Sequence, residues 1–161
     1  MFYTSLSERL QHQHFALAQI IAPLAEEQLM GELEPGKWSV HENMAHLVSY
    51  QPQFLSRLHR ILDSQDPFFD RYIGDDDPTF LYWRRQSSGT LLKELEADRQ
   101  QIIQLLESLS NEQLLRTGTH ASYGKLNITE WTEFFLLHEA HHLLTIFKLV
   151  HKARQSMVHG R

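Results

Sequence analysis

The pattern of hydrophobic and polar positions along the chain predicts long helices and no convincing strand. Near the N-terminus, apolar residues recur at helical spacing in one stripe, formed by Leu6, Leu10, Leu17, Ile21 and Leu24. A second helix is predicted to begin at Ser39, because Glu42 stands three residues later and the two can form a capping box. It ends near Asp63, and a third amphipathic helix covers residues 90–109.

The fourth predicted helix is the most apolar part of the chain. Asn127 and Glu130 mark its start, and residues 131–150 are hydrophobic on nearly every side, which is typical of a buried helix. His138 and His142 lie four residues apart, so both imidazoles can face one cation. Burying two imidazoles is costly unless they find partners, and either a divalent metal or hydrogen bonds inside the bundle would supply them.

The lengths of the connections predict how the helices are arranged. The first and third connections are short enough for antiparallel neighbours, whereas residues 64–89 can carry the chain back along the bundle. We therefore expect an all-α, four-helix bundle that runs up-down-down-up, with a long crossover between helices 2 and 3. His46 would then lie level with His138 and His142. Two aromatic residues of the crossover, Tyr82 and Trp83, are predicted to form a pocket wall.

Composition limits the possible functions. The 161 residues fit one domain, residues 1–161. A net charge of −5 without a basic cluster argues against nucleic acid as a partner. No run of 18 apolar residues and no signal segment is present, so we expect a cytoplasmic protein without a membrane partner. There are no cysteines, so any thiol chemistry must come from a substrate.

Three neutral nitrogen donors leave a metal with an open position, which suits a catalytic site. A closed structural site would normally have four protein ligands. His138 and His142 also fit the H-E-x-x-H zinc-protease pattern, with Glu139 as a candidate general base. The rest of the metzincin pattern is missing, since Thr145 and Lys148 stand where Gly and His are required. Glu139 lies about 100° around the helix from His138, so it could equally be a solvated or dimer-face residue.

The segments GKWSVHENMAHL and ITEWTEFFLLHEAHHLLTI together resemble the DinB/YfiT-like superfamily, and the likeness covers nearly the whole chain. The family pattern falls here on Trp38, Ser39, His46, His138 and His142. The resemblance implies a zinc or nickel ion held by the three histidines, with water or substrate completing the shell, and frequent dimerisation. The family includes S-transferases and isomerases that use low-molecular-weight thiols, so the resemblance also implies thiol chemistry of this kind as one candidate activity.

These observations predict a metal-dependent enzyme that acts on a small molecule and forms a homodimer. The metal would activate water in a hydrolase, or an external low-molecular-weight thiol in an S-transferase. A non-catalytic metal-binding or stress-response protein is the alternative. Of the remaining polar residues, His14 is expected to be a hydrogen-bonded core or boundary histidine, His41 to lie in an exposed first turn and Asp98 to be half-exposed.

Overall fold

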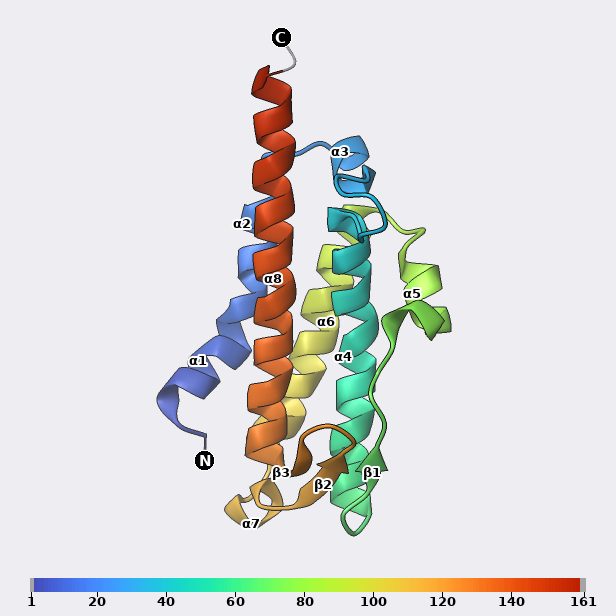
Figure 1. Cartoon of the computed structure of the whole chain (residues 1–161). Coiled ribbons are helices and arrows are strands. Elements are labelled where there is room, and N and C mark those ends of the chain that lie inside the picture. Colours follow the sequence, from blue (N-terminus) through green and yellow to red (C-terminus); the bar gives the residue numbers. More distant parts are fainter. Residues whose placement is uncertain (1, 160–161) are drawn as a thin grey trace.

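The computed structural model describes residues 2–159, apart from the side chains of Asp76 and residues 157–159. Its helices form an elongated bundle, with a small sheet at one end (Figure 1). The α-helices are α1 (Thr4–His12), α2 (Ala16–Ile21), α3 (Glu26–Met30), α4 (Val40–Asp63), α5 (Pro78–Trp83), α6 (Ser88–Ser108), α7 (Asn111–Leu114) and α8 (Ile128–His159). The 3-10 turns are η1 (Gln13–Phe15) and η2 (Gly74–Asp76), and the strands are β1 (Phe68–Phe69), β2 (Thr117–His120) and β3 (Gly124–Asn127).

The predicted up-down-down-up path is confirmed (Figure 1). The segment α1–η1–α2 runs up the bundle and α4 runs down. The crossover then returns to the top, carrying β1, η2 and α5, so that α6 also runs down and α8 runs up. The central helix α4 packs against both α6 and α8. Antiparallel α4 and α8 therefore place the early part of α4 beside the later turns of α8.

Both predicted capping boxes are present, and they fix where the two histidine-bearing helices begin. In α4, Ser39 Oγ accepts from the Glu42 backbone N–H at 3.1 Å, and Glu42 Oε2 accepts from Ser39 N–H at 2.8 Å. In α8, Asn127 Oδ1 accepts from the Glu130 N–H at 3.0 Å. An N-cap of this kind contributes about 1 kcal/mol to helix stability. The caps thereby set which turns of each helix carry the histidines.

The sequence pattern did not predict the small sheet. β1 pairs in parallel with β2, matching Phe69 with His120, and β2 pairs antiparallel with β3, matching His120 with Gly124. These strands are two to four residues long, too short for alternation to show in the sequence. The sheet joins the crossover to the segment before α8, and it positions His120.

Buried apolar residues form two clusters, one towards each end of the bundle. Between the clusters, each long segment of the bundle contributes a buried polar side chain at a matching level. They are His14 from η1, His46 and Gln51 from α4, Arg99 from α6, and Glu139 and His142 from α8. We call this set the polar layer. Two of its members, His46 and His142, also belong to the candidate site.

The outer face of α8 carries a stripe of apolar side chains. Leu137, Leu144 and Phe147 are each more than half exposed. The predicted homodimer stays a prediction, and this stripe is the part of α8 that a second copy could cover. No helix among residues 2–159 combines the length and the apolar character needed to cross a membrane.

Candidate metal centre

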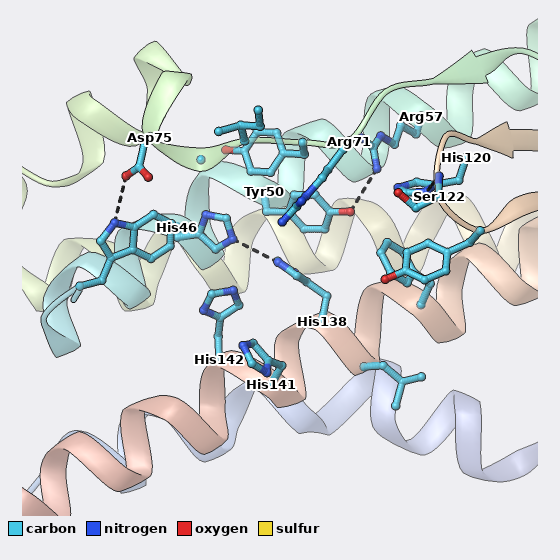
Figure 2. A pocket seen from close by; sticks show the side chains of 17 residues that line it. His46, Tyr50, Arg57, Arg71, Asp75, His120, Ser122, His138, His141 and His142 are labelled. Carbon is cyan, nitrogen blue, oxygen red and sulfur yellow. Dashed lines mark hydrogen bonds between the residues drawn. The ribbon is translucent and has the colours of Figure 1, made fainter. Parts of the chain in front are cut away.

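The structure brings together the three histidines singled out in the sequence. His46 comes from α4, and His138 and His142 come from successive turns of α8 (Figure 2). One ring nitrogen from each lies within 4.8 Å of the other two, and the Nε2 atoms of His46 and His138 are 3.1 Å apart. Tetrahedral zinc ligands at about 2.05 Å from the metal are about 3.3 Å from one another. The spacing of the three rings is therefore close to that of a metal-ligand set.

The three imidazoles are neutral at physiological pH. Burial lowers the pKa of His46, of His138 and of His142 to about 3. A smaller cause is the proximity of another imidazole, because a proton on one ring disfavours a proton on the next. A neutral imidazole keeps the lone pair that a metal needs.

The hydrogen bonds of the three rings are incomplete within the protein. Among residues 2–159, Nδ1 of His46 and Nδ1 of His138 have no hydrogen-bond partner. His142 differs, because its Nδ1 lies 2.9 Å from Asn43 Oδ1. The Asn43 amide nitrogen donates to the Ser39 carbonyl oxygen at 2.8 Å, so its oxygen faces His142 and accepts the Nδ1 proton. Nε2 of His142 is thereby left with a free lone pair, as a metal ligand requires.

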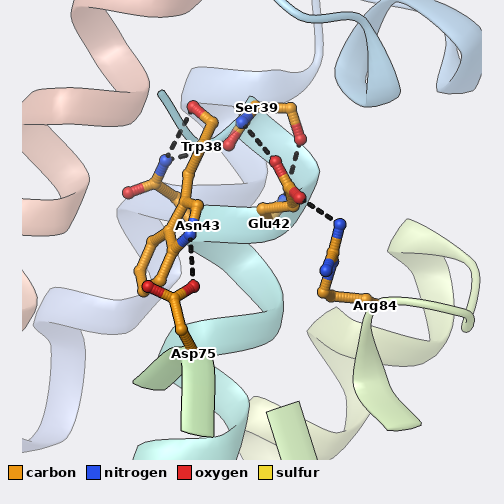
Figure 3. A network of polar contacts seen from close by, with 6 residues as sticks. All are labelled: Trp38, Ser39, Glu42, Asn43, Asp75 and Arg84. Carbon is orange, nitrogen blue, oxygen red and sulfur yellow. Dashed lines mark hydrogen bonds and ion pairs between the residues drawn. The ribbon is translucent and has the colours of Figure 1, made fainter. Parts of the chain in front are cut away.

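Trp38 and η2 cover the site from the side of the crossover. The Trp38 ring contacts the ring of His46 at a centroid distance of 4.9 Å, and its Nε1 donates to Asp75 Oδ1 at 3.0 Å (Figure 3). Gly74 approaches so closely that a Cβ atom there would lie 2.6 Å from His46 Nδ1. Only glycine allows η2 to pack on the imidazole in this way. An ion pair between Glu42 and Arg84 ties α5 to the start of α4.

A cavity of about 900 Å³ opens beside the histidines. Its wall combines aromatic, basic and apolar side chains. The lining residues are Trp38, His46, Tyr50, Arg57, Arg71, Tyr72, Ile73, Gly74, Asp75, His120, Ser122, Tyr123, Phe134, Leu137, His138, His141 and His142. The size suits a small organic molecule.

Tyr72 is held in place by two polar neighbours. Its hydroxyl donates to Asp77 Oδ2 at 2.7 Å and lies 3.1 Å from Ser49 Oγ. Burial and the Asp77 carboxylate raise the pKa of Tyr72, so the phenol stays protonated. This hydrogen-bonded chain fixes one wall of the cavity.

The predicted pocket wall needs correction. The crossover does form a wall, but Tyr82 and Trp83 do not line the cavity. Tyr82 is 57% exposed, and Trp83 packs against the apolar cluster that includes Leu17 and Phe80. Both belong to α5, which lies farther along the crossover than the segment that faces the histidines. That segment contributes Tyr72, Ile73, Gly74 and Asp75.

The suggestion that Glu139 acts as a general base is contradicted by its position. Its side chain is 1% exposed, forms an ion pair with Arg99 and accepts from Gln13 Nε2 at 2.9 Å. It does not line the cavity. The interpretation of Glu139 as a solvated or dimer-face residue is also wrong, because the carboxylate is buried in the polar layer. Arg99 was missed, although it falls on the inner stripe of α6 between Leu95 and Ile102.

The other polar predictions have mixed outcomes. His14 is a buried core residue as expected, but neither of its ring nitrogens has a hydrogen-bond partner among the described residues, so it is not the satisfied histidine that the sequence predicts. Asp98 is half-buried, with its pKa raised to about 6 mainly by burial. His41 was expected to be exposed but is only 3% exposed. The reason is that α3 and the start of α6 close over the first turn of α4, where Glu26 accepts from the Ser88 N–H at 2.8 Å.

Comparison with known proteins now places the chain in a family. Residues 9–146 match the DinB superfamily, and the chain belongs to that superfamily. The sequence resemblance is thereby confirmed.

One relative and one solved structure match most of this length. A protein of Oceanobacillus iheyensis named "Putative metal-dependent hydrolase OB0413" is 24% identical over 135 residues, which are 81% of this chain and 75% of that protein. YfiT from Bacillus subtilis has the same fold, with a TM-score of 0.78 at 18% identity over 92% of this chain and 85% of its own. YfiT is described as "a probable metal-dependent hydrolase with an unusual four-helix bundle topology".

Proposed function

We propose that this protein is a divalent-metal-dependent hydrolase that acts on a small molecule, with His46, His138 and His142 as the metal ligands. The observation that carries the proposal is the meeting of three neutral imidazoles, those of His46 and His142 buried and that of His138 half-buried, within 4.8 Å at the wall of a cavity. Among the described residues, Nδ1 of His46 and Nδ1 of His138 have no hydrogen-bond partner, whereas a cation would use one lone pair from each of the three rings. The names of the two relatives point to the same class.

A zinc or nickel ion held by three nitrogen donors would have an open position and would act there as a Lewis acid towards water or a substrate carbonyl. The protein's own residues supply orientation and cover. Asn43 fixes the His142 ring, and Trp38 packs over His46. His141 also lines the cavity, with its ring centroid 5.2 Å from that of His142. It is therefore placed to move a proton at the reacting bond, the role that Glu139 cannot fill.

Thiol transfer is the second candidate function. A cavity of about 900 Å³ has room for a low-molecular-weight thiol beside a second substrate. The thiol would have to be a co-substrate, because the chain has no cysteine. The same three histidines would bind the metal in either reaction.

Metal analysis of protein purified without a histidine tag tests the site. After incubation with zinc or nickel and removal of free ions, we expect about one equivalent per chain. Changing His46, His138 or His142 to Ala should lower metal affinity by orders of magnitude while the circular dichroism stays helical, since the apolar clusters carry most of the folding energy. His141→Ala is the matched control, because it removes a neighbouring histidine from outside the ligand set.

Metal retained in all three single variants would contradict the ligand assignment. If the parent protein binds metal, two activity panels separate the candidate functions. Turnover of esters or amides without added thiol supports hydrolysis, whereas turnover that requires a thiol and an electrophile supports transfer. Metal binding without turnover in either panel would favour the non-catalytic alternative.

A further inference from the structure

The cavity extends from the histidines along α4 to Arg57. Arg57 follows His46 by eleven residues, which is about 16 Å along the helix axis. Tyr50 lies between them (Figure 2). Its ring centroid is 4.4 Å from that of His138, and its hydroxyl accepts from Arg57 Nη1 at 3.2 Å. One wall therefore joins the candidate metal centre to a cationic group farther down the helix.

Arg57 is a buried charge without a carboxylate partner among the side chains that the structure describes. It is 9% exposed, and no acidic side chain in the described part of the protein lies within ion-pair distance of its guanidinium. Its other polar contact is donation to the Asp70 carbonyl oxygen at 3.0 Å, and it lies 5.5 Å from the centre of the Trp131 ring. Buried charges are normally paired. Arg99, buried in the same bundle, is paired with Glu139.

Two more donors line the cavity with Arg57. Arg71 is exposed, and its side chain extends from the crossover towards the cavity (Figure 2). His120 accepts from the Ser122 backbone N–H at 3.0 Å through Nδ1, so it is neutral and carries its proton on Nε2 as a donor. Burial and, after it, the positive charge of Arg57 lower the pKa of His120, in keeping with their proximity.

The acidic residue of the cavity wall does not neutralise this end. Asp75 is the one carboxylate among the lining residues whose side chains the structure describes, and it binds Trp38 Nε1 beside the candidate metal centre. Arg57, Arg71 and the neutral donor His120 form one end of the cavity, which we call the cationic end after its two arginines.

We propose that the cationic end binds the anionic group of the substrate, a carboxylate or a phosphate, while the rest of the molecule extends along Tyr50 and Tyr72 to the three histidines. A planar guanidinium pairs well with either anion, and the anion would supply the partner that Arg57 lacks. The position of the reacting bond rests on the proposed function. The anion site itself rests only on the cationic end.

Binding of three probes tests the proposal on the protein as purified. The probes are 4-phenylbutyrate, its neutral analogue 4-phenylbutyramide, and 2-phenylethyl phosphate, each measured by isothermal titration calorimetry. We expect at least one of the anions to bind about tenfold or more tightly than the amide, which is the discrimination typical of a charge-assisted hydrogen bond. The tighter of the two anions identifies the preferred group.

Two variants and a control locate the anion. Arg57→Gln should abolish the preference for the anions over the amide. Arg71→Gln should reduce it several-fold, and because Arg71 is exposed this variant gives an answer even if Arg57→Gln fails to fold. Arg60→Gln is the matched control and should preserve the preference, since Arg60 lies one turn farther along α4, is exposed and does not line this cavity.

His142→Ala separates this proposal from the proposed function. A preference for the anion that survives in this variant supports the cationic end, whether or not the protein binds metal. The proposal would be overturned if His142→Ala abolished the preference while Arg57→Gln and Arg71→Gln both preserved it. That result would place the anion at the histidines. Equal binding of the anions and the amide by the parent protein would also overturn it, leaving the measured metal content unaffected.

Discussion

His138 and Glu139 are neighbours in the sequence, but their side chains enter different environments. Successive residues of a helix point about 100° apart, so His138 faces the cavity and Glu139 faces α6 across the bundle. Arg99 meets Glu139 there and also donates to the Leu10 carbonyl oxygen at 3.2 Å and to Gln51 Oε1 at 3.3 Å. The glutamate of the H-E-x-x-H pattern is therefore a structural residue of the polar layer.

This role predicts a stability effect for Glu139→Gln. The variant leaves the Arg99 guanidinium buried without a counterion, which costs about 3–5 kcal/mol when one partner of a buried pair is removed. We expect the free energy of unfolding, measured by urea denaturation, to fall by that order.

The double variant Arg99→Met with Glu139→Leu is the control, because it removes both charges and should recover most of the stability. Native Glu139→Gln protein should still bind metal. If the variant is as stable as the parent but has lost metal binding or activity, Glu139 would instead belong to the candidate site.

At the scale of elements, η2 can lie against the histidines because Gly74 has no side chain. A Cβ atom at this position would lie 2.6 Å from His46 Nδ1 and 3.0 Å from Trp38 Cη2. Neither ring can move far, because the His46 side chain is buried in the bundle and Trp38 donates a hydrogen bond to Asp75. The close approach of this turn thus fixes both the cover of the site and the orientation of His46.

We expect Gly74→Ala to push η2 away from α4 and to loosen the candidate metal centre. Metal affinity should fall about tenfold or more, as when a group that orients a ligand is lost, while the melting temperature changes little because both apolar clusters remain. Gly89→Ala in α6 is the control, since a Cβ atom there has only Ser87 Oγ nearby, at 4.0 Å. Equal metal affinity in the two variants would show that η2 does not hold His46 in place.

Some features of the site could be predicted from the sequence and others could not. The starts of α4 and α8 depend on local capping boxes, and the pairing of His138 with His142 depends on helical spacing, so both are visible in the chain. Asn43, Gly74 and Arg57 depend on which segments meet in three dimensions. The prediction for Tyr82 and Trp83 rests on the aromatic character of the crossover, which does not say which part of a long crossover faces the site.

At the scale of the whole molecule, the path of the chain brings the three histidines together. The length of the crossover predicted parallel α4 and α6, and hence an antiparallel α4 and α8 with His46 level with His138. The polar layer was not predictable as a unit, because His14, Arg99 and Glu139 come from different helices and each alone resembles an exception in an apolar stripe. Their common level emerges only when the helices are packed.

The buried histidines make the stability of the whole molecule depend on pH. Burial and, after it, the charge of Arg99 lower the pKa of His14 to about 4. Mainly through burial, the three candidate ligands have pKa values of about 3. In the unfolded chain a histidine has a pKa of about 6.5. Below that pH the unfolded state takes up protons that the native state does not, so stability is complete above pH 6.5 and falls towards pH 4. Asp98 acts in the opposite direction, because its raised pKa of about 6 favours the protonated native state.

His14→Leu isolates one of these contributions without touching a candidate metal ligand. We expect the free energy of unfolding of the chelator-treated parent to decrease between pH 6.5 and pH 4, and the variant to lose less, with a slope smaller by up to about 1.4 kcal/mol per pH unit. Urea denaturation at intervals of half a pH unit measures both slopes. His59→Leu is the control, because the His59 side chain is exposed near the end of α4 and its loss should leave the slope unchanged. Identical slopes for His14→Leu and the parent would mean that His14 takes up its proton equally well in the native and the unfolded states.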